Sequence, residues 1–153
     1  MQLLQLLNEE RTRVDLLAVD KQDLLGQLAG LLARDAVEES KLRHSLELRE
    51  RLGPTALGHG IAIPHGRSPG IGEARAAFVR LATAIDFGAS DGIPVDLIAA
   101  LVVPAHFTDE HLTLLAEAAE LFSDDGLIAA LRAAPDAATL YRELAQFAAR
   151  RPA

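Results

Sequence analysis

Cysteine is absent from the 153-residue chain, and this absence removes disulfide bonds, thiolate zinc sites and cysteine nucleophiles together. Such usage is typical of a reducing compartment, so we expect a cytoplasmic location. Tryptophan is also absent and aromatic residues make up 4% of the chain, so the core must be built from Leu, Ala, Val and Ile. A core of that kind favours helices packed on a buried sheet.

Long apolar runs are also lacking: none reaches a membrane-spanning length, and the N-terminus has no basic start of a signal peptide. Basic residues are in the minority, with a formal net charge of -7. The missing apolar run predicts that the chain does not insert into a membrane. The acidic charge argues against nucleic acid or an anionic membrane surface as the main partner, because both attract proteins through clustered Lys and Arg. An acidic chain can still bind a basic protein. The length predicts a single domain over residues 1–153, with its core at about 3–148.

Periodic leucines predict an amphipathic helix from Asp20, as N-cap, to about Leu32. Further helices are expected at about 38–52, 109–123, 124–133 and 136–148, the last with Asp136 as N-cap. Strands are expected at 61–63, 78–85 and 95–103. The last of these is apolar almost without alternation, which is typical of a central strand covered on both faces.

On a helical wheel with about 100° per residue, Arg49 lies near the centre of an apolar face. The residues of that face are Leu42, Leu46, Leu48 and Leu52, and those opposite are His44, Glu47 and Arg51. An isolated buried charge is costly, so we expect Arg49 either to pair with a buried carboxylate such as Asp96 or to emerge into a cleft and meet an anion.

Two of the five histidines stand in distinctive surroundings. His65 lies between Pro64 and Gly66, and this order predicts an imidazole held on a rigid, exposed edge. His111 follows Thr108, Asp109 and Glu110, the order of an N-cap and an acidic first helical turn. Free backbone N–H groups in a first turn favour a nearby anion, although the acidic neighbours oppose it.

A glycine-flanked turn, Gly58-His59-Gly60, could bring backbone amides close to a phosphate. No Walker lysine follows it, and its spacing fits no dinucleotide-binding fingerprint. Together with Arg49, His65 and His111, it describes phosphoryl transfer by a nucleophilic imidazole with a second ring and a guanidinium beside it.

The segment from Leu48 to His65 reads LRERLGPTALGHGIAIPH. It closely resembles the signature of the fructose/mannitol-type (type 2) IIA domains of the bacterial phosphotransferase system (PTS), and most of all the nitrogen-related IIA proteins (EIIA-Ntr). The resemblance covers nearly the whole chain. It continues through FVRL at 78–81, PVDL at 94–97, LVVP at 101–104 and HL at 111–112.

The resemblance implies a three-layer α/β fold, with a mixed, mostly parallel sheet flanked by helices on both faces. It also implies that His65 accepts a phosphoryl group, normally on Nε2, from an HPr-like or NPr-like histidine phosphocarrier, with Arg49 and His111 beside it. The protein would then be a stoichiometric phosphotransferase component without a cofactor or metal, and its next partner would be a regulatory target or a IIB protein.

The phosphate loop expected at Thr55, Gly58, His59 and Gly60 departs from the family pattern. Pro54 stands where Ser is usual, Ala56 where Gly is common, and His59 where Asn or a small polar residue is typical. These changes remove a hydroxyl and a flexible hinge from the loop, whereas Thr55 remains as a hydroxyl donor.

Three alternatives remain open. The first is a sugar-route IIA that passes phosphate to a IIB partner, although a chain with no membrane segment and no cysteine-bearing IIB-like part favours the regulatory branch. The second is a regulatory binding module that is never phosphorylated. The third is a metal hydrolase that uses His59, His65 and His111, whose spacing matches no helical zinc motif.

Overall fold

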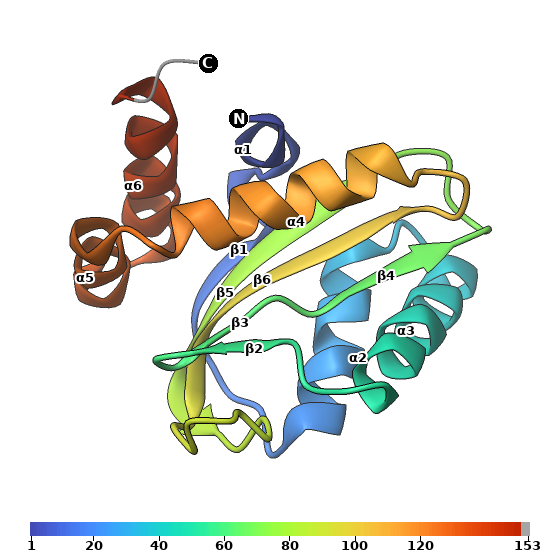
Figure 1. The fold of residues 1–153 in the computed structure, drawn as a ribbon, viewed down its shortest axis with the longest axis horizontal. Helices are drawn as coiled ribbons and strands as arrows, with labels where there is room; N and C mark the ends of the chain where they lie inside the picture. The colour runs from blue at the N-terminus through green and yellow to red at the C-terminus, as the bar shows by residue number, and fades with distance from the viewer. Residues whose placement is uncertain (151–153) are drawn as a thin grey trace.

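In the computed structural model, one six-stranded sheet lies between two groups of helices (Figure 1). The structure describes residues 1–150, so residues 151–153 of the expected domain lie outside the described residues. The helices are α1 (Gln2–Leu6), the 3-10 helix η1 (Glu9–Arg11), α2 (Lys21–Leu32), α3 (Ala36–Arg51), α4 (Asp109–Leu121), α5 (Asp125–Ala133) and α6 (Ala137–Arg150). The strands are β1 (Thr12–Leu16), β2 (Ala56–Gly58), β3 (Ile61–Ala62), β4 (His65–Ser68), β5 (Arg75–Ile85) and β6 (Val95–Pro104).

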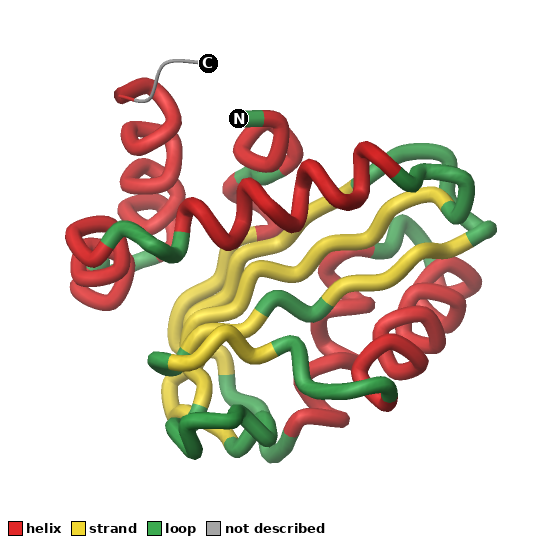
Figure 2. The backbone as a smooth tube through the Cα atoms, viewed as in Figure 1, coloured by secondary structure: helices red, strands yellow, loops and turns green. Residues whose placement is uncertain are grey.

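The sheet has the order β1-β5-β6-β3-β2, and β4 also pairs with β6. The β1–β5, β3–β6 and β4–β6 pairs are parallel, whereas β5–β6 and β2–β3 are antiparallel, which confirms the expected mixed, mostly parallel sheet. Ile61 is opposite Leu97, and His65 is opposite Leu101. β4 therefore continues β3 along the same side of β6, as the two successive strand segments in Figure 2 show.

The central strand β6 contributes to the core on both faces of the sheet, as its continuous apolar sequence predicts. Leu97 and Leu101 pack in one cluster with side chains of α1, α4, α5 and α6. Ile98 and Val102 pack in the other cluster with α2 and α3. Successive side chains of a strand point to opposite faces, so one strand joins two cores.

The long elements agree with the sequence predictions to within a few residues. Asp20 caps α2 by accepting a hydrogen bond from the backbone N of Asp23, and Asp136 does the same for Thr139 at the start of α6. β1, β2 and β4 were not predicted, nor were the two short N-terminal helices. None of the helices within residues 1–150 combines the length and apolar character needed to cross a membrane.

The predicted apolar face of α3 is partly wrong. Leu42 and Leu46 are buried as expected, but the exposed fraction is 46% for Leu48 and 85% for Leu52. The third buried residue of the helix is Glu50, which follows Leu46 at the same four-residue spacing. The buried stripe is rotated from the predicted one, and it leaves Arg49 at its edge rather than at its centre.

Candidate functional site

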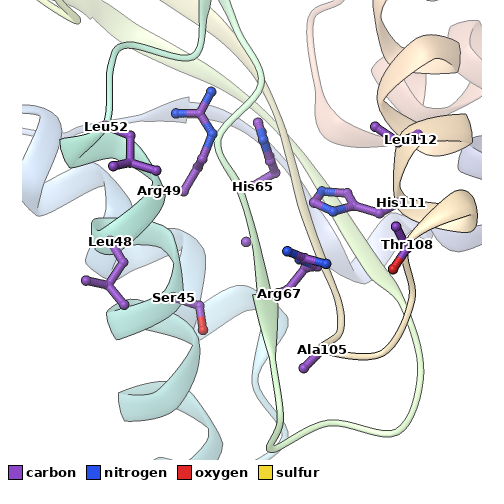
Figure 3. A pocket seen from close by; sticks show the side chains of 11 residues that line it. Ser45, Leu48, Arg49, Leu52, His65, Arg67, Ala105, Thr108, His111 and Leu112 are labelled. Atoms are coloured by element: carbon purple, nitrogen blue, oxygen red, sulfur yellow. The ribbon is translucent and has the colours of Figure 1, made fainter.

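A pocket of about 590 Å³ opens where α3, β4 and the start of α4 meet. Its polar lining includes Arg49 of α3, His65 and Arg67 of β4, and His111 of α4. Figure 3 shows these side chains gathered from the three elements around a common space. The structure thus brings together the three residues that the sequence marked for chemistry at the site.

His65 is held in a defined orientation by the backbone two residues before it. Its Nδ1 atom lies 2.7 Å from the carbonyl oxygen of Ile63. A carbonyl oxygen can only accept, so Nδ1 must carry the proton, and in the neutral ring the lone pair is then on Nε2. Burial lowers the pKa of His65 and Arg49 adds to this effect, although the Ile63 hydrogen bond and Glu50 oppose it. Lowering the pKa of His65 favours the neutral, nucleophilic form.

His111 faces His65 across the pocket, with ring centroids 5.3 Å apart and ring planes at 70°. Burial, His65, Arg67 and Arg49 together lower the pKa of His111 to about 4, so the ring is neutral at pH 7. Its Nε2 atom is buried and makes no hydrogen bond within the described chain. A buried nitrogen without a hydrogen-bond partner is costly, and no contact among the described residues offsets this cost.

The position of His111 in the first turn of a helix is confirmed, because α4 begins at Asp109. Thr108 occupies the N-cap position, but its side chain makes no capping hydrogen bond. The expected N-cap position is therefore confirmed, without a hydrogen bond from the side chain, and Thr108 also lines the pocket.

Arg49 emerges into the pocket rather than pairing with Asp96. Its Nη1 atom donates to the carbonyl oxygen of Gly53 at 3.0 Å, just beyond the end of α3. Asp96 instead pairs with Arg132, at 2.9 Å between Nη2 and Oδ1. Of the two alternatives for Arg49, the ion pair with Asp96 is wrong. Asp96 lies near the turn between β2 and β3, where Arg132 also donates to the carbonyl of His59.

Arg67 is a pocket residue that the sequence reasoning missed. It follows His65 by two residues on β4, and alternate residues of a strand lie on the same face. The two-residue spacing is visible in the sequence, but it indicates a shared face only within a strand, and the sequence predicts no strand at 65–68. Recognition of β4 depends on its pairing with β6, about 35 residues later.

The rim of the pocket is apolar and exposed. Leu48 and Leu52 of the α3 end and Leu112 of α4 line it, and the exposed fraction of Leu112 is 63%. Three exposed leucines around one pocket mark a surface suited to contact with another protein.

The residues predicted as a phosphate loop do not line this pocket. Gly58, His59 and Gly60 have φ angles of 91°, 58° and 82°, and they turn β2 into β3. The backbone N of His59 already donates to Asp91 Oδ2 at 2.8 Å, so this amide binds the protein's own carboxylate. Thr55 is 6% exposed and its hydroxyl donates to Glu50. These four residues therefore lie outside the pocket of His65, and their role as a phosphate loop stays a prediction. Among the described residues no group of three or more His, Cys, Asp or Glu side chains could hold a metal ion, so His59 forms no such group with His65 and His111.

The family model for the EIIA 2 domain of the phosphoenolpyruvate-dependent sugar phosphotransferase system matches residues 5–147. The nitrogen regulatory protein of Pseudomonas aeruginosa is 39% identical over 144 residues, which cover 93% of this chain and 94% of that protein.

Two solved structures are also similar to this chain. The crystal structure of the nitrogen regulatory protein IIA-Ntr from Neisseria meningitidis has a TM-score of 0.87 and 34% identity, covering 94% of this chain and 99% of that chain. A complex of enzyme IIA-Mtl with phosphorylated enzyme IIB-Mtl from Escherichia coli has a TM-score of 0.73 and 19% identity, covering 92% and 99%. At 19% identity, the similarity to IIA-Mtl shows a shared fold alone.

Proposed function

We propose that this chain, which belongs to the EIIA type 2 family of the phosphotransferase system, carries a phosphoryl group on Nε2 of His65. Membership gives the protein a phosphocarrier or regulatory role in that system. The observation that carries the proposal is the bond from His65 Nδ1 to the carbonyl of Ile63, because it leaves the lone pair of Nε2 as the ring's nucleophile.

The donor in the proposed reaction is the phosphohistidine of an HPr-like or NPr-like carrier protein. Nε2 of His65 attacks the phosphorus in line, a new N–P bond forms, and the donor's N–P bond breaks with its electron pair returning to the donor imidazole. The guanidinium of Arg49 offsets the negative charge of the transferring group. The ring of His111, with its centroid 5.3 Å from that of His65, is the second imidazole beside the transferring group.

We assign the protein to the regulatory branch, with similarity as the support. The match to nitrogen regulatory proteins spans both chains almost completely, and the IIA-Ntr structure is more similar than that of IIA-Mtl in both identity and TM-score. The sugar route is the second candidate, favoured by the complex in which a IIA protein of the same fold is bound to a phosphorylated IIB protein.

The test is phosphorylation of the purified protein by phosphoenolpyruvate, enzyme I and a histidine phosphocarrier, followed by intact-mass measurement. We expect a gain of one acid-labile phosphoryl group, lost in His65→Ala and kept in His44→Ala, an exposed histidine of α3 outside the pocket. A wild-type protein that gains no mass would support the unphosphorylated binding module. An undiminished gain in His65→Ala would refute the site.

The phosphorylated protein then separates the two branches. Incubation with a mannitol-type or fructose-type IIB protein should leave the phosphoryl group on His65 if the protein is regulatory. Rapid transfer to the IIB protein would instead place it on the sugar route.

A further inference from the structure

A buried carboxylate lies directly beside the candidate site, on the residue that follows Arg49. The side chain of Glu50 is 4% exposed, and three donors meet its two oxygens. The hydroxyl of Thr55 donates to Oε2 at 2.7 Å, the backbone N of Thr55 donates to Oε1 at 3.0 Å, and Nζ of Lys21 lies 2.9 Å from Oε1. Glu50 is thus fully occupied by partners within the protein.

This arrangement fixes the short turn between α3 and β2. A buried carboxylate is costly unless its hydrogen bonds are made, so the segment from Glu50 to Thr55 is held where those bonds form. The carbonyl of Gly53, in the middle of that segment, accepts the hydrogen bond from Nη1 of Arg49. The Glu50–Thr55 pair therefore sets the position of the atom that orients the Arg49 guanidinium.

Thr55 also ties this turn to the segment that holds His65. Its carbonyl accepts a hydrogen bond from the backbone N of Ile63 at 3.0 Å, and the carbonyl of Ile63 in turn holds Nδ1 of His65 at 2.7 Å. The side chain of Thr55 thus holds the turn beside Arg49, and the backbone carbonyl of Thr55 holds the segment that orients His65. Neither Glu50 nor Thr55 lines the pocket itself.

We propose that the buried Glu50–Thr55 pair is the positioning element of this site, and that it sets the placement of Arg49 relative to His65. The inference rests on the proposed transfer to His65. The hydrogen bond between the two side chains acts through Arg49, and neither residue lines the pocket that would receive the phosphoryl group. Preorganised charge controls such transfers, and a misplacement of about 1 Å is enough to slow them strongly.

The decisive substitution is Thr55→Val, which removes the hydroxyl but keeps the backbone carbonyl that binds Ile63. We expect the transfer rate at saturating phosphocarrier to fall about tenfold, because Arg49 loses its orientation. The carrier concentration for half-maximal rate should stay within about twofold, since the pocket rim is unchanged. Thr55→Ser keeps the hydroxyl and should restore most of the rate.

Arg49→Ala makes the test specific to positioning. Alone, it should slow transfer about a hundredfold, as expected for loss of a charge that stabilises the transition state. If Thr55 acts through Arg49, adding Thr55→Val to Arg49→Ala should change the rate by less than about twofold. A full additional tenfold loss in the double variant would overturn the proposal, because Thr55 would then act independently of the guanidinium.

Thr12→Val is the matched control. Thr12 is a fully buried threonine on β1 whose hydroxyl donates to the carbonyl of Asn8 at 2.8 Å, and it does not line the pocket. The substitution likewise removes the hydrogen bond of a buried threonine hydroxyl. The melting temperature of Thr12→Val should therefore fall, while its transfer rate stays at the wild-type value. Equal slowing in Thr12→Val and Thr55→Val would reduce the effect of Thr55 to general stability and overturn the inference.

The two proposals fail in different ways. A wild-type protein that takes up no phosphoryl group contradicts the proposed function, and the inference falls with it. A wild-type protein that is phosphorylated on His65 at the same rate as Thr55→Val contradicts the positioning role alone. All rates are to be measured below the melting temperature of every variant.

Discussion

The two facing histidines differ in what their ring nitrogens contact. Nδ1 of His65 is held by a backbone carbonyl, whereas Nε2 of His111 is buried without a partner in the described chain. Both rings have lowered pKa values, chiefly because burial disfavours their charged forms. A neutral pair is the arrangement that a nucleophilic imidazole needs near pH 7.

We predict that His111 titrates with a pKa of about 4 in the folded protein. Because Arg67 is one of the cations that lower this value, Arg67→Ala should raise the pKa of His111 toward the ordinary value of 6.5. The measurement is the pH dependence of the His111 ring signals in NMR spectra of the wild type and of Arg67→Ala. A His111 pKa unchanged by Arg67→Ala would show that the guanidinium lies too far away to act.

The same shift has a consequence for stability. The unfolded chain binds a proton at His111 with a pKa of 6.5, but the folded protein does so only at about 4. The free energy of unfolding therefore decreases as the pH falls through this window, because the unfolded state takes up more protons. His111→Asn should remove part of this decrease in urea unfolding measured between these pH values.

At the residue scale, the sequence motif correctly predicted that Arg49, His65 and His111 lie together in one site. It misplaced Thr55, because a hydroxyl in a glycine-rich segment gives no sign of which acceptor it will meet. The acceptor is Glu50, whose burial was hidden by its charge and by the exposed leucines on either side of it, Leu48 and Leu52.

At the scale of elements, the site depends on how closely β4 approaches α3. A Cβ atom added to Gly66 would lie 3.0 Å from the C, O and Cβ atoms of Ser45. Two of these atoms belong to the backbone of a helix, so they cannot move as a flexible side chain would. The absence of a side chain at Gly66 therefore sets the distance between the strand of His65 and the helix of Arg49.

Gly66→Ala should consequently destabilise the protein and slow phosphoryl transfer. We expect a loss of about 1–3 kcal/mol in the free energy of unfolding, from the crowding of β4 against α3. Gly72→Ala is the control, because a Cβ atom at Gly72 has nothing within 4 Å, and it should stay within about 0.5 kcal/mol of the wild type. Urea unfolding and the transfer assay test both statements, and a Gly66→Ala protein as stable as Gly72→Ala would contradict the first.

The long elements were predictable because each has a local sequence pattern: helical periodicity of leucines in α2 and a continuous apolar run in β6. The short strands β2 and β4 were not, since their few residues become strands only through pairing with remote partners. The helical wheel of α3 failed for a related reason: it scored leucines as buried, whereas the end of this helix lies beside an open pocket that leaves Leu52 85% exposed.

At the scale of the whole molecule, two cores share one sheet. Leu28 of α2 belongs to the cluster on one face, and Tyr141 of α6 packs against the cluster on the other. β6 supplies side chains to both, so neither cluster can lose its structure without disturbing the strand that the other needs. We expect cooperative unfolding across the sheet.

Leu28→Ala tests this coupling, because the chain has a single tyrosine and no tryptophan. The substitution should lower the free energy of unfolding by about 2–5 kcal/mol, as expected for a fully buried leucine. Tyr141 fluorescence and far-UV circular dichroism should shift to the same lower urea midpoint. Val37→Ala, at a position 65% exposed, should leave both midpoints nearly unchanged. A tyrosine transition that stays at the wild-type midpoint in Leu28→Ala would show that the two faces unfold separately.

The close packing of Gly66 against Ser45 limits how the site can adapt to a partner protein. β4 is engaged by β6 along one side and by α3 across its face, so the peptide chain that bears His65 has no slack in either direction. Any conformational change on binding should then occur in the partner protein or by rotation of the His65 side chain. A rigid pocket of this kind should select between partner proteins by the shape of its rim, and we expect the exposed Leu48, Leu52 and Leu112 of that rim to contact them.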